Sequence, residues 1–128
     1  MSRDRRRLID YLGHMLEAVQ QAGSYVVGMD ESEFLRNRLV QDAVIRNIEI
    51  VGEASRNIER HYPEYVRENP DVPFSAAYEM RNVLAHGYFK VDLQAVWLTV
   101  KRDLPAIAAQ ITPLLAALRQ QEGAEPTA

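Results

Sequence analysis

Apolar residues recur at intervals of three and four positions through most of the chain, and this spacing limits the possible folds more than any other feature. In the first such segment, expected to form a helix over residues 2–27, the apolar positions are Leu8, Leu12, Met15, Leu16, Val19, Ala22 and Val26. Gly28 follows as a residue suited to end a helix. No segment alternates apolar and polar residues as a β-strand does. The sequence therefore predicts an all-α protein.

The second apolar segment is expected to form the central helix. It begins near the capping residues Asp30 and Ser32, is expected to bend at Asn37, and ends before Pro63. Apolar residues cover much of its circumference, which is typical of a helix surrounded by others. A turn of helix is expected in the connector at residues 64–68.

Two further helices complete the predicted fold. A short one opens at residues 73–75, with Ser75 as a candidate cap, and ends near residue 86. The last is long and is capped by Asp92. Pro105 lies inside its apolar stripe, which predicts either a kink or a restart capped by Asp103.

The chain has 128 residues, enough for one domain with one core. We expect an up-down bundle of four main helices over residues 1–119 and a disordered tail over residues 120–128. The net charge of -3 argues against a protein that binds polyanions over its whole surface, although a local basic patch can suffice. Cys is absent and no apolar run reaches the ~18 residues that span a bilayer. We therefore expect a cytoplasmic protein.

Two polar features interrupt the apolar pattern. Residues 3–7 are the densest basic cluster and form either a solvated tail or an edge that faces phosphate. Asp42, Arg46, Glu49 and Glu53 form a stripe along the central helix, in which Asp42 with Arg46 and Arg46 with Glu49 are spaced to pair. This stripe is either a solvated face or a polar wall beside an active cleft, and the sequence leaves both open.

Several kinds of site lack their sequence signature. His14, His61 and His86 are far apart, and neither His-Glu-x-x-His nor Glu-x-x-His is present. Gly-x-Ser-x-Gly and a Gly-rich phosphate loop are also absent. We therefore expect no metal site, no cofactor and no serine nucleophile.

The strongest candidate site is the segment Met-Arg-Asn-Val-Leu-Ala-His-Gly-Tyr-Phe at residues 80–89. Arg81 and His86 are five positions apart, about 140° on a regular helix, so their side chains converge only where the helix ends. Gly87 supplies such an end and frees Tyr88 to reach back. Residues 56–61 repeat the Arg-x4-His spacing, but no Gly follows them. The first cluster is therefore the better candidate.

An Arg and a His without a metal suit phosphodiester cleavage. The imidazole can move a proton, and the guanidinium can stabilise charge on the phosphate oxygens. RNA supplies its own nucleophile, the 2′-hydroxyl. Cleavage needs an acid and a base, so a second His86 across a two-fold axis is one reason to expect a dimer. The alternative is structural: Arg81 pairs with the carboxylate stripe and His86 caps a helix.

Three segments together resemble the HepT family of the HEPN superfamily. Residues 41–54 resemble its central-helix signature, and residues 80–89 look like its Arg-x4-His-x-Tyr motif. Val91-Asp92-Leu93, Val96-Trp97 and Asp103-Leu104-Pro105 are similar to its last helix. The likeness covers roughly residues 5–118.

The resemblance implies an all-α homodimer that is the ribonuclease toxin of a toxin–antitoxin pair, with tRNA as its target. It implies that Arg81 and His86 are catalytic in a cleft at the dimer interface. The antitoxin would be an MntA-type nucleotidyltransferase that adds AMP to Tyr88. The supporting residues of the cleft would be Asn82, Gly87, Asp42, Arg46 and Glu49.

The sequence departs from the family pattern at three positions. Glu79 stands where Gly is expected, Ala85 replaces Val, and Phe74 replaces Trp. Glu79 adds a carboxylate near Arg81, which would restrain the guanidinium or weaken RNA binding. The alternative function is a non-catalytic subunit that holds a nucleotide or substrate for a nucleotidyltransferase.

Overall fold

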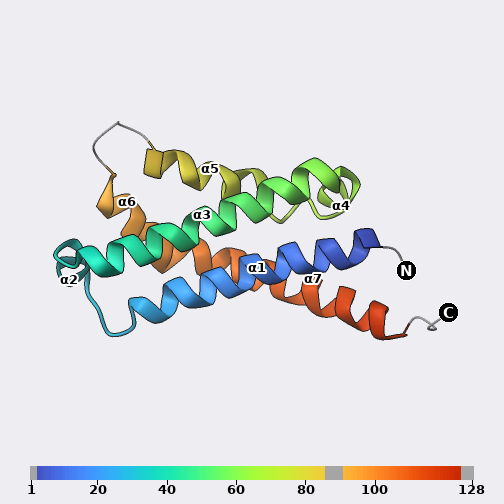
Figure 1. Ribbon diagram of the computed structural model, residues 1–128, viewed down its shortest axis with the longest axis horizontal. Coiled ribbons are helices and arrows are strands. Elements are labelled where there is room, and N and C mark those ends of the chain that lie inside the picture. Colours follow the sequence, from blue (N-terminus) through green and yellow to red (C-terminus); the bar gives the residue numbers. More distant parts are fainter. Residues whose placement is uncertain (1–2, 86–90, 125–128) are drawn as a thin grey trace.

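The computed structural model describes residues 3–85 and 91–124, and this part of the chain contains helices and no strand, which confirms the predicted fold class. The elements are α1 (Arg3–Tyr25), α2 (Glu31–Leu35), α3 (Arg38–His61), α4 (Pro63–Glu68), α5 (Phe74–Ala85), α6 (Leu93–Leu98), the π-helical turn η1 (Thr99–Asp103) and α7 (Leu104–Ala124) (Figure 1).

Local capping signals fix the start of α2 as predicted. After α1 ends, Gly28 adopts a left-handed conformation with φ 73°, which only glycine takes at little cost. The Asp30 carboxylate accepts a hydrogen bond from Glu33 N at 2.8 Å, and the Glu33 carboxylate accepts one from Asp30 N at 3.1 Å. This reciprocal capping box makes Asp30 the cap and places Ser32 inside the helix.

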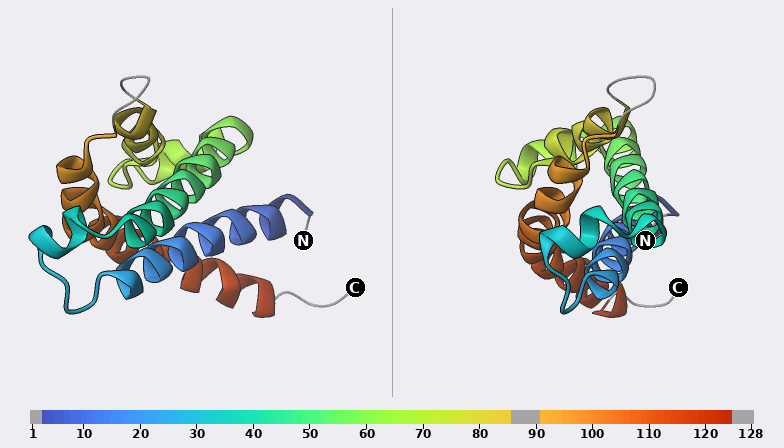
Figure 2. Two further views of the ribbon diagram at one scale, coloured as in Figure 1. Left: turned by 60° about the vertical axis from the view of Figure 1, so that its left-hand side comes forward. Right: turned by 90° about the vertical axis from the view of Figure 1, so that its left-hand side faces the viewer.

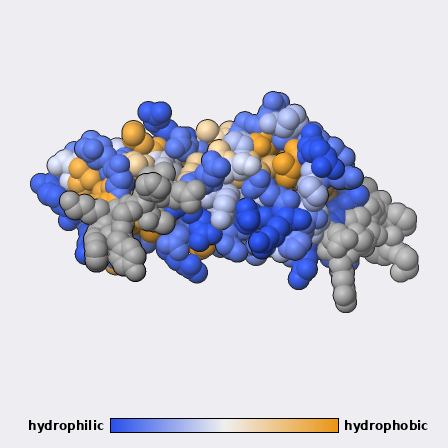
Figure 3. All heavy atoms as spheres, turned by 90° about the horizontal axis from the view of Figure 1, so that it is seen from above, coloured by the Kyte–Doolittle hydropathy of each residue, from blue (hydrophilic) through white to orange (hydrophobic). Residues whose placement is uncertain are grey.

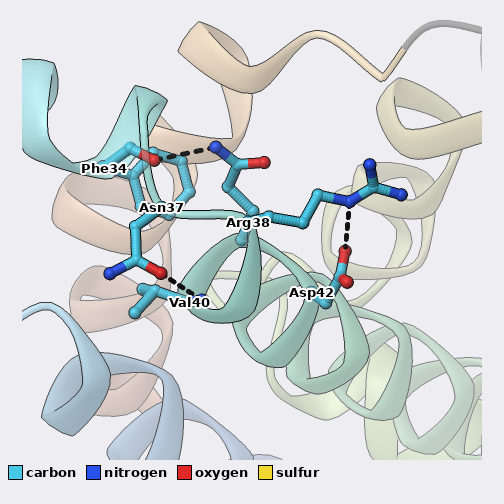
Figure 4. A network of polar contacts seen from close by, with 6 residues as sticks. Phe34, Asn37, Arg38, Val40 and Asp42 are labelled. Carbon is cyan, nitrogen blue, oxygen red and sulfur yellow. Dashed lines mark hydrogen bonds and ion pairs between the residues drawn. The ribbon is translucent and has the colours of Figure 1, made fainter.

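The predicted bend near Asn37 separates α2 from α3. Asn37 caps α3, since its Oδ1 accepts a hydrogen bond from Val40 N at 3.0 Å (Figure 4). The buried Gln41 side chain donates from Nε2 to the Phe34 carbonyl at 2.9 Å, which closes the junction from the inside. Side chains at the bend thus form hydrogen bonds with the backbone N–H of Val40 and the backbone carbonyl of Phe34.

The prediction that α3 is the central helix is confirmed. It packs against α1 and α5 and also contacts α2, α4 and α6 (Figures 1 and 2). In the end-on view of Figure 2, α1, α3, α5 and α7 surround a shared interior. Fully buried side chains from these and the shorter helices fill it, among them Leu12, Met15, Phe34, Val44, Ile48, Ile58, Phe74, Val96, Leu104, Ile111 and Leu115.

Two serines bind α5 to α3. The buried Ser55 hydroxyl donates to the Phe74 carbonyl at 2.6 Å, at the first residue of α5. Ser75 donates to the Glu59 carboxylate at 2.6 Å, so its hydroxyl faces α3 and is not the helix cap that the sequence indicated. These contacts set the position of α5, which carries Arg81.

The last helical run contains a π-helical turn rather than a restart. Asp92 caps α6 as predicted, accepting a hydrogen bond from Ala95 N at 3.1 Å. Leu104 N donates to the Thr99 carbonyl, five residues back, which makes η1 wider than an α-turn. The wide turn ends at Asp103, two residues before Pro105, which has no N–H to donate. Asp103 lies inside this turn, so its predicted role as a cap is wrong.

The last helix extends into the stretch that was expected to form a tail. α7 runs through Pro113 and continues to Ala124. The Arg6 guanidinium lies 3.4 Å from the Glu122 carboxylate, which ties this end of α7 to the start of α1 (Figure 1). Arg, Gln and Glu, which dominate positions 119–122, are good helix formers. Residues 125–128 lie outside the described part.

Within residues 3–85 and 91–124, no helix is long and apolar enough to cross a membrane. Seen from above, hydrophilic residues cover much of the surface, and hydrophobic residues lie between them in smaller groups (Figure 3).

Candidate active cleft

A cleft of about 260 Å³ lies where α1, α3 and α5 meet, and Arg81 lines it from α5. We refer to it as the Arg81 cleft. Its other polar lining residues are Tyr11, His14, Arg46, Glu49, Glu53 and Asn57. The cleft thus combines two guanidinium groups, two carboxylates and one imidazole, contributed by three helices that are far apart in the sequence.

The Arg81 guanidinium is held at this cleft by two contacts. Its Nη1 lies 3.3 Å from the Glu53 carboxylate on α3, and its Cζ lies 5.7 Å from the centre of the Tyr78 ring. The side chains of Arg81 and Glu53 are 40% and 65% exposed, so this ion pair is worth at most about 1 kcal/mol. The structural alternative for Arg81, pairing with the carboxylate stripe, is therefore confirmed as a contact. It leaves the guanidinium exposed enough to exchange Glu53 for another anion.

Close packing on Gly52 fixes the path of the Arg81 side chain. A Cβ placed on Gly52 would lie 2.6 Å from both Cγ and Cδ of Arg81. Real Cβ atoms essentially never come so close to a neighbour. Gly52 is buried in α3, and its missing side chain is the space that the Arg81 stem occupies on its way to the cleft. Sequence reasoning missed this role because it depends on how α5 crosses α3.

The polar stripe on α3 is divided between two surroundings. Arg46, Glu49 and Glu53 line the Arg81 cleft, as one of the two interpretations predicted. Asp42 does not line it and pairs instead with Arg38, one turn earlier, at 3.7 Å (Figure 4). The predicted pairs of Arg46 with Asp42 and with Glu49 are absent among the described residues. Asp42 does not pair with Arg46 because Arg38, at the start of α3, pairs with it instead. Arg46 remains exposed at the cleft.

Three predicted site residues, His86, Gly87 and Tyr88, lie outside the described residues, and so does the side chain of Asn82. Their roles remain predictions. Glu79 is exposed on α5 and makes no ion pair within the described part of the chain. The carboxylate that restrains Arg81 is therefore Glu53.

The second Arg-x4-His pair in the sequence does not form a comparable site. The Arg56 guanidinium stacks on the Tyr78 ring, 4.7 Å from its centre. His61 lines a separate hollow of about 160 Å³ with Arg7, Tyr11 and Tyr62. Arg56 and His61 therefore lie in different surroundings. This agrees with the expectation that this pair, which no Gly follows, is the weaker candidate site.

His14 is the cleft residue that the sequence did not reveal. In the sequence, His14 stood out only as a possible metal ligand. Among the described residues, no group of three or more His, Asp and Glu side chains is placed to hold a metal ion. His14 also lines an adjoining hollow of about 330 Å³ together with Glu17, Gln21 and Tyr25 of α1 and Asn47 of α3. The available signal was the spacing of Tyr11, His14, Gln21 and Tyr25, which places polar side chains on one face of an otherwise apolar helix.

Comparison with known proteins supports one family. A model of the family described as "Ribonuclease HepT-like" matches residues 15–114. "Probable ribonuclease HepT" of Thermococcus cleftensis is 36% identical over 105 residues, which cover 82% of this chain and 93% of that protein. "Gamma-glutamylcyclotransferase and putative RNase MJ0434" of Methanocaldococcus jannaschii is also 36% identical over 105 residues. That match covers 82% of this chain but 46% of the longer relative, so the chain spans less than half of its length. No solved structure matches. The extent of the family match shows that the chain belongs to the HepT-like ribonuclease family.

Proposed function

We propose that this chain is a metal-independent ribonuclease that cleaves RNA at the Arg81 cleft, with Arg81 and His86 as catalytic residues. The observation that carries the proposal is the position of Arg81. Arg81 lines the cleft, and its partly exposed guanidinium is held by an exposed ion pair with Glu53 and a contact with the Tyr78 ring. Arg46 adds a second positive charge to the same cleft. Family membership supports RNA as the substrate.

These residues suit a cleavage in which the RNA attacks itself. A base removes the proton of the 2′-hydroxyl while its oxygen attacks the adjacent phosphorus. The bond from phosphorus to the 5′-oxygen breaks, and an acid protonates that oxygen. The products are a 2′,3′-cyclic phosphate and a 5′-hydroxyl. Arg81 and Arg46 stabilise the charge that builds on the phosphate oxygens, and His86 performs one of the proton transfers.

We extend the proposal to the finer assignments that the family resemblance suggests. The chain forms a two-fold homodimer and is the toxin of a toxin–antitoxin pair, with tRNA as its substrate. A nucleotidyltransferase antitoxin adds AMP to Tyr88, and the bulky, charged nucleotide blocks entry of RNA. The support for this regulation is the position of Tyr88 in the sequence, two residues beyond the motif histidine.

Incubation of the purified protein with total tRNA in the presence of EDTA tests the proposal. We expect cleavage by the wild type, with strong loss in Arg81→Ala and His86→Ala. A protein that binds ATP tightly but cleaves no RNA would favour the non-catalytic subunit instead. Co-expression with an MntA-type nucleotidyltransferase, followed by mass spectrometry, should show AMP on the peptide that contains Tyr88; an unmodified tyrosine in the presence of ATP would contradict that part.

A further inference from the structure

The basic cluster at residues 3–7 is a feature that cleavage at the Arg81 cleft does not explain. Arg7 of this cluster lines a hollow of about 160 Å³ together with Tyr11, His61 and Tyr62, and we refer to it as the Arg7 hollow. We propose that the Arg7 hollow is a second RNA-binding subsite, which holds the phosphate and base of a nucleotide that flanks the one cleaved in the Arg81 cleft. This inference rests on the proposed ribonuclease function.

The Arg7 hollow adjoins the Arg81 cleft. Tyr11 lines both recesses, with Arg7 one turn before it and His14 one turn after it on the same face of α1. This face therefore leads over about 10 Å from the hollow into the cleft. The opposite wall of the hollow contains His61, the last residue of α3, at the end of the bundle where α1 begins (Figure 1). An RNA strand held in the cleft can thus continue along α1 into the hollow.

Charge distinguishes the Arg7 hollow from its neighbours. The described residues that line it supply one guanidinium and no carboxylate. The other hollows described along α1 all contain carboxylates, which are Glu49 and Glu53 in the Arg81 cleft, Glu17 in the hollow beside it, and Asp10 and Glu122 between α1 and α7. Arg81 must exchange Glu53 for a phosphate, whereas Arg7 makes no ion pair with any side chain that the structure describes. In a protein with a net charge of -3, the Arg7 hollow is therefore a place where a polyanion meets little repulsion.

The side chains of the Arg7 hollow suit one nucleotide of a single strand. Arg7 can form a forked contact with a phosphate, and His61 keeps an N–H donor in either protonation state. The half-buried rings of Tyr11 and Tyr62 meet edge-on, with their centroids 6.5 Å apart, so they do not use their faces on each other. Aromatic faces beside a positive charge are the usual platform for unpaired bases. The volume of about 160 Å³ is below the ~300 Å³ at which small-molecule pockets begin, which favours part of a longer chain over a free nucleotide.

The test measures the binding of 2′-O-methylated RNA, which cannot be cleaved, to Arg7→Gln, Arg7→Lys and Arg6→Gln. Arg6 is the matched control because it lies next to Arg7 in the basic cluster and its substitution removes the same charge. Its guanidinium, however, lies 3.4 Å from the Glu122 carboxylate, and it lines the hollow between α1 and α7. Oligonucleotides of increasing length are titrated at several salt concentrations and followed by fluorescence anisotropy. Tyr62→Leu and Tyr62→Phe are compared in the same way, since only phenylalanine keeps the aromatic ring.

We expect the affinity of the wild type to rise when the RNA becomes long enough to reach from the cleft to the hollow. Arg7→Gln should lose this rise, and the slope of log affinity against log salt should become shallower by about 0.7, the value for one phosphate contact with a single strand. Arg7→Lys should keep most of the slope, and Arg6→Gln should bind like the wild type. Tyr62→Leu should bind the long RNA at least about fivefold more weakly, as expected for the loss of one stacked base, and Tyr62→Phe should not.

Two results would overturn the subsite. Equal losses in Arg6→Gln and Arg7→Gln would show that the overall charge of the cluster is responsible rather than the Arg7 hollow. A loss in Arg7→Gln that is the same for the shortest and the longest RNA would show that Arg7 does not contact a flanking nucleotide. Cleavage of tRNA by the wild type would leave the proposed function intact in both cases. A wild-type protein that cleaves no tRNA would instead overturn the proposed function, and this inference with it.

Discussion

The aliphatic stem of Arg81 lies directly over Gly52, with Cγ and Cδ each 2.6 Å from where a Cβ of residue 52 would stand. The guanidinium then reaches Glu53, the next residue of α3, at 3.3 Å. Gly52 and Glu53, two consecutive residues of α3, thus determine the position of the Arg81 guanidinium. The active geometry proposed for this protein depends on a close approach of two helices as much as on the motif itself.

Gly52→Ala should displace Arg81 and reduce cleavage of tRNA by at least about tenfold, since small misplacements of a catalytic group are costly. The helical position itself suits alanine, so the loss should not come from the backbone. Gly23→Ala is the control, because a Cβ at Gly23 would meet no atom within 4 Å. It should leave activity unchanged and stabilise α1 by up to about 1 kcal/mol. Equal activity in the two variants, measured after both are shown to be folded, would contradict the role of Gly52.

Glu53→Gln should increase the affinity for a 2′-O-methylated RNA severalfold, because in the proposed site Glu53 competes with phosphate for Arg81, with which it forms an ion pair. The free energy of unfolding should change by no more than about 1 kcal/mol, as is usual for an exposed ion pair. Fluorescence anisotropy at low salt measures the affinity. Glu79→Gln carries the same charge change on α5 without a described contact to Arg81, and it should have a smaller effect. If the two variants gain equally, overall charge rather than the Glu53 contact is responsible.

Ser55→Ala should lower the free energy of unfolding by about 1–3 kcal/mol, the cost of leaving a buried carbonyl without its donor. Its hydroxyl donates to the buried Phe74 carbonyl and fixes the start of α5. Ser75→Ala removes an exposed bond to Glu59 and should cost less than about 0.5 kcal/mol. Denaturant unfolding of both variants makes the comparison. A Ser75→Ala variant that is as unstable as Ser55→Ala would show that burial does not govern the difference.

The raised pKa of Tyr65 predicts that the free energy of unfolding falls at alkaline pH. Partial burial and the nearby Glu68 carboxylate both raise the pKa of the Tyr65 phenol above its ordinary value of 10.0. The folded protein therefore keeps this proton where the unfolded chain releases it. The contribution is fully present below pH 10 and is lost as the pH rises through the folded pKa. Unfolding measured between pH 9 and 12 should show a shallower decline for Tyr65→Phe than for the wild type; parallel curves would contradict the assignment.

Local sequence signals predicted much of the fold because the interactions behind them are local. Asp30, Asn37 and Asp92 each cap a helix through a hydrogen bond to a backbone N–H three residues later. Gly28 takes its left-handed conformation without help from distant residues. The apolar circumference of α3 likewise required a central position, whatever the order of the surrounding helices.

What local spacing did not predict concerns contacts between elements or choices between equal partners. Asp42 had two arginines within one turn, and spacing alone did not favour Arg38 over Arg46. The extension of α7 is accompanied by the contact of Glu122 with Arg6, more than a hundred residues away. His14 could be recognised as a cleft residue only once α1 was packed on α3 beside Arg81.

The most direct test of the central claim is the rate of tRNA cleavage by Arg81→Ala compared with Arg56→Ala. Both arginines lie over the Tyr78 ring and each begins an Arg-x4-His sequence, but Arg81 alone of the two lines the cleft. We predict that Arg81→Ala loses at least about 10²-fold in rate, as expected when a charge-stabilising group is removed from the site of cleavage. Arg56→Ala should remain within threefold of the wild type. Equal rates for the two variants, or an Arg81→Ala protein as active as the wild type, would contradict the account.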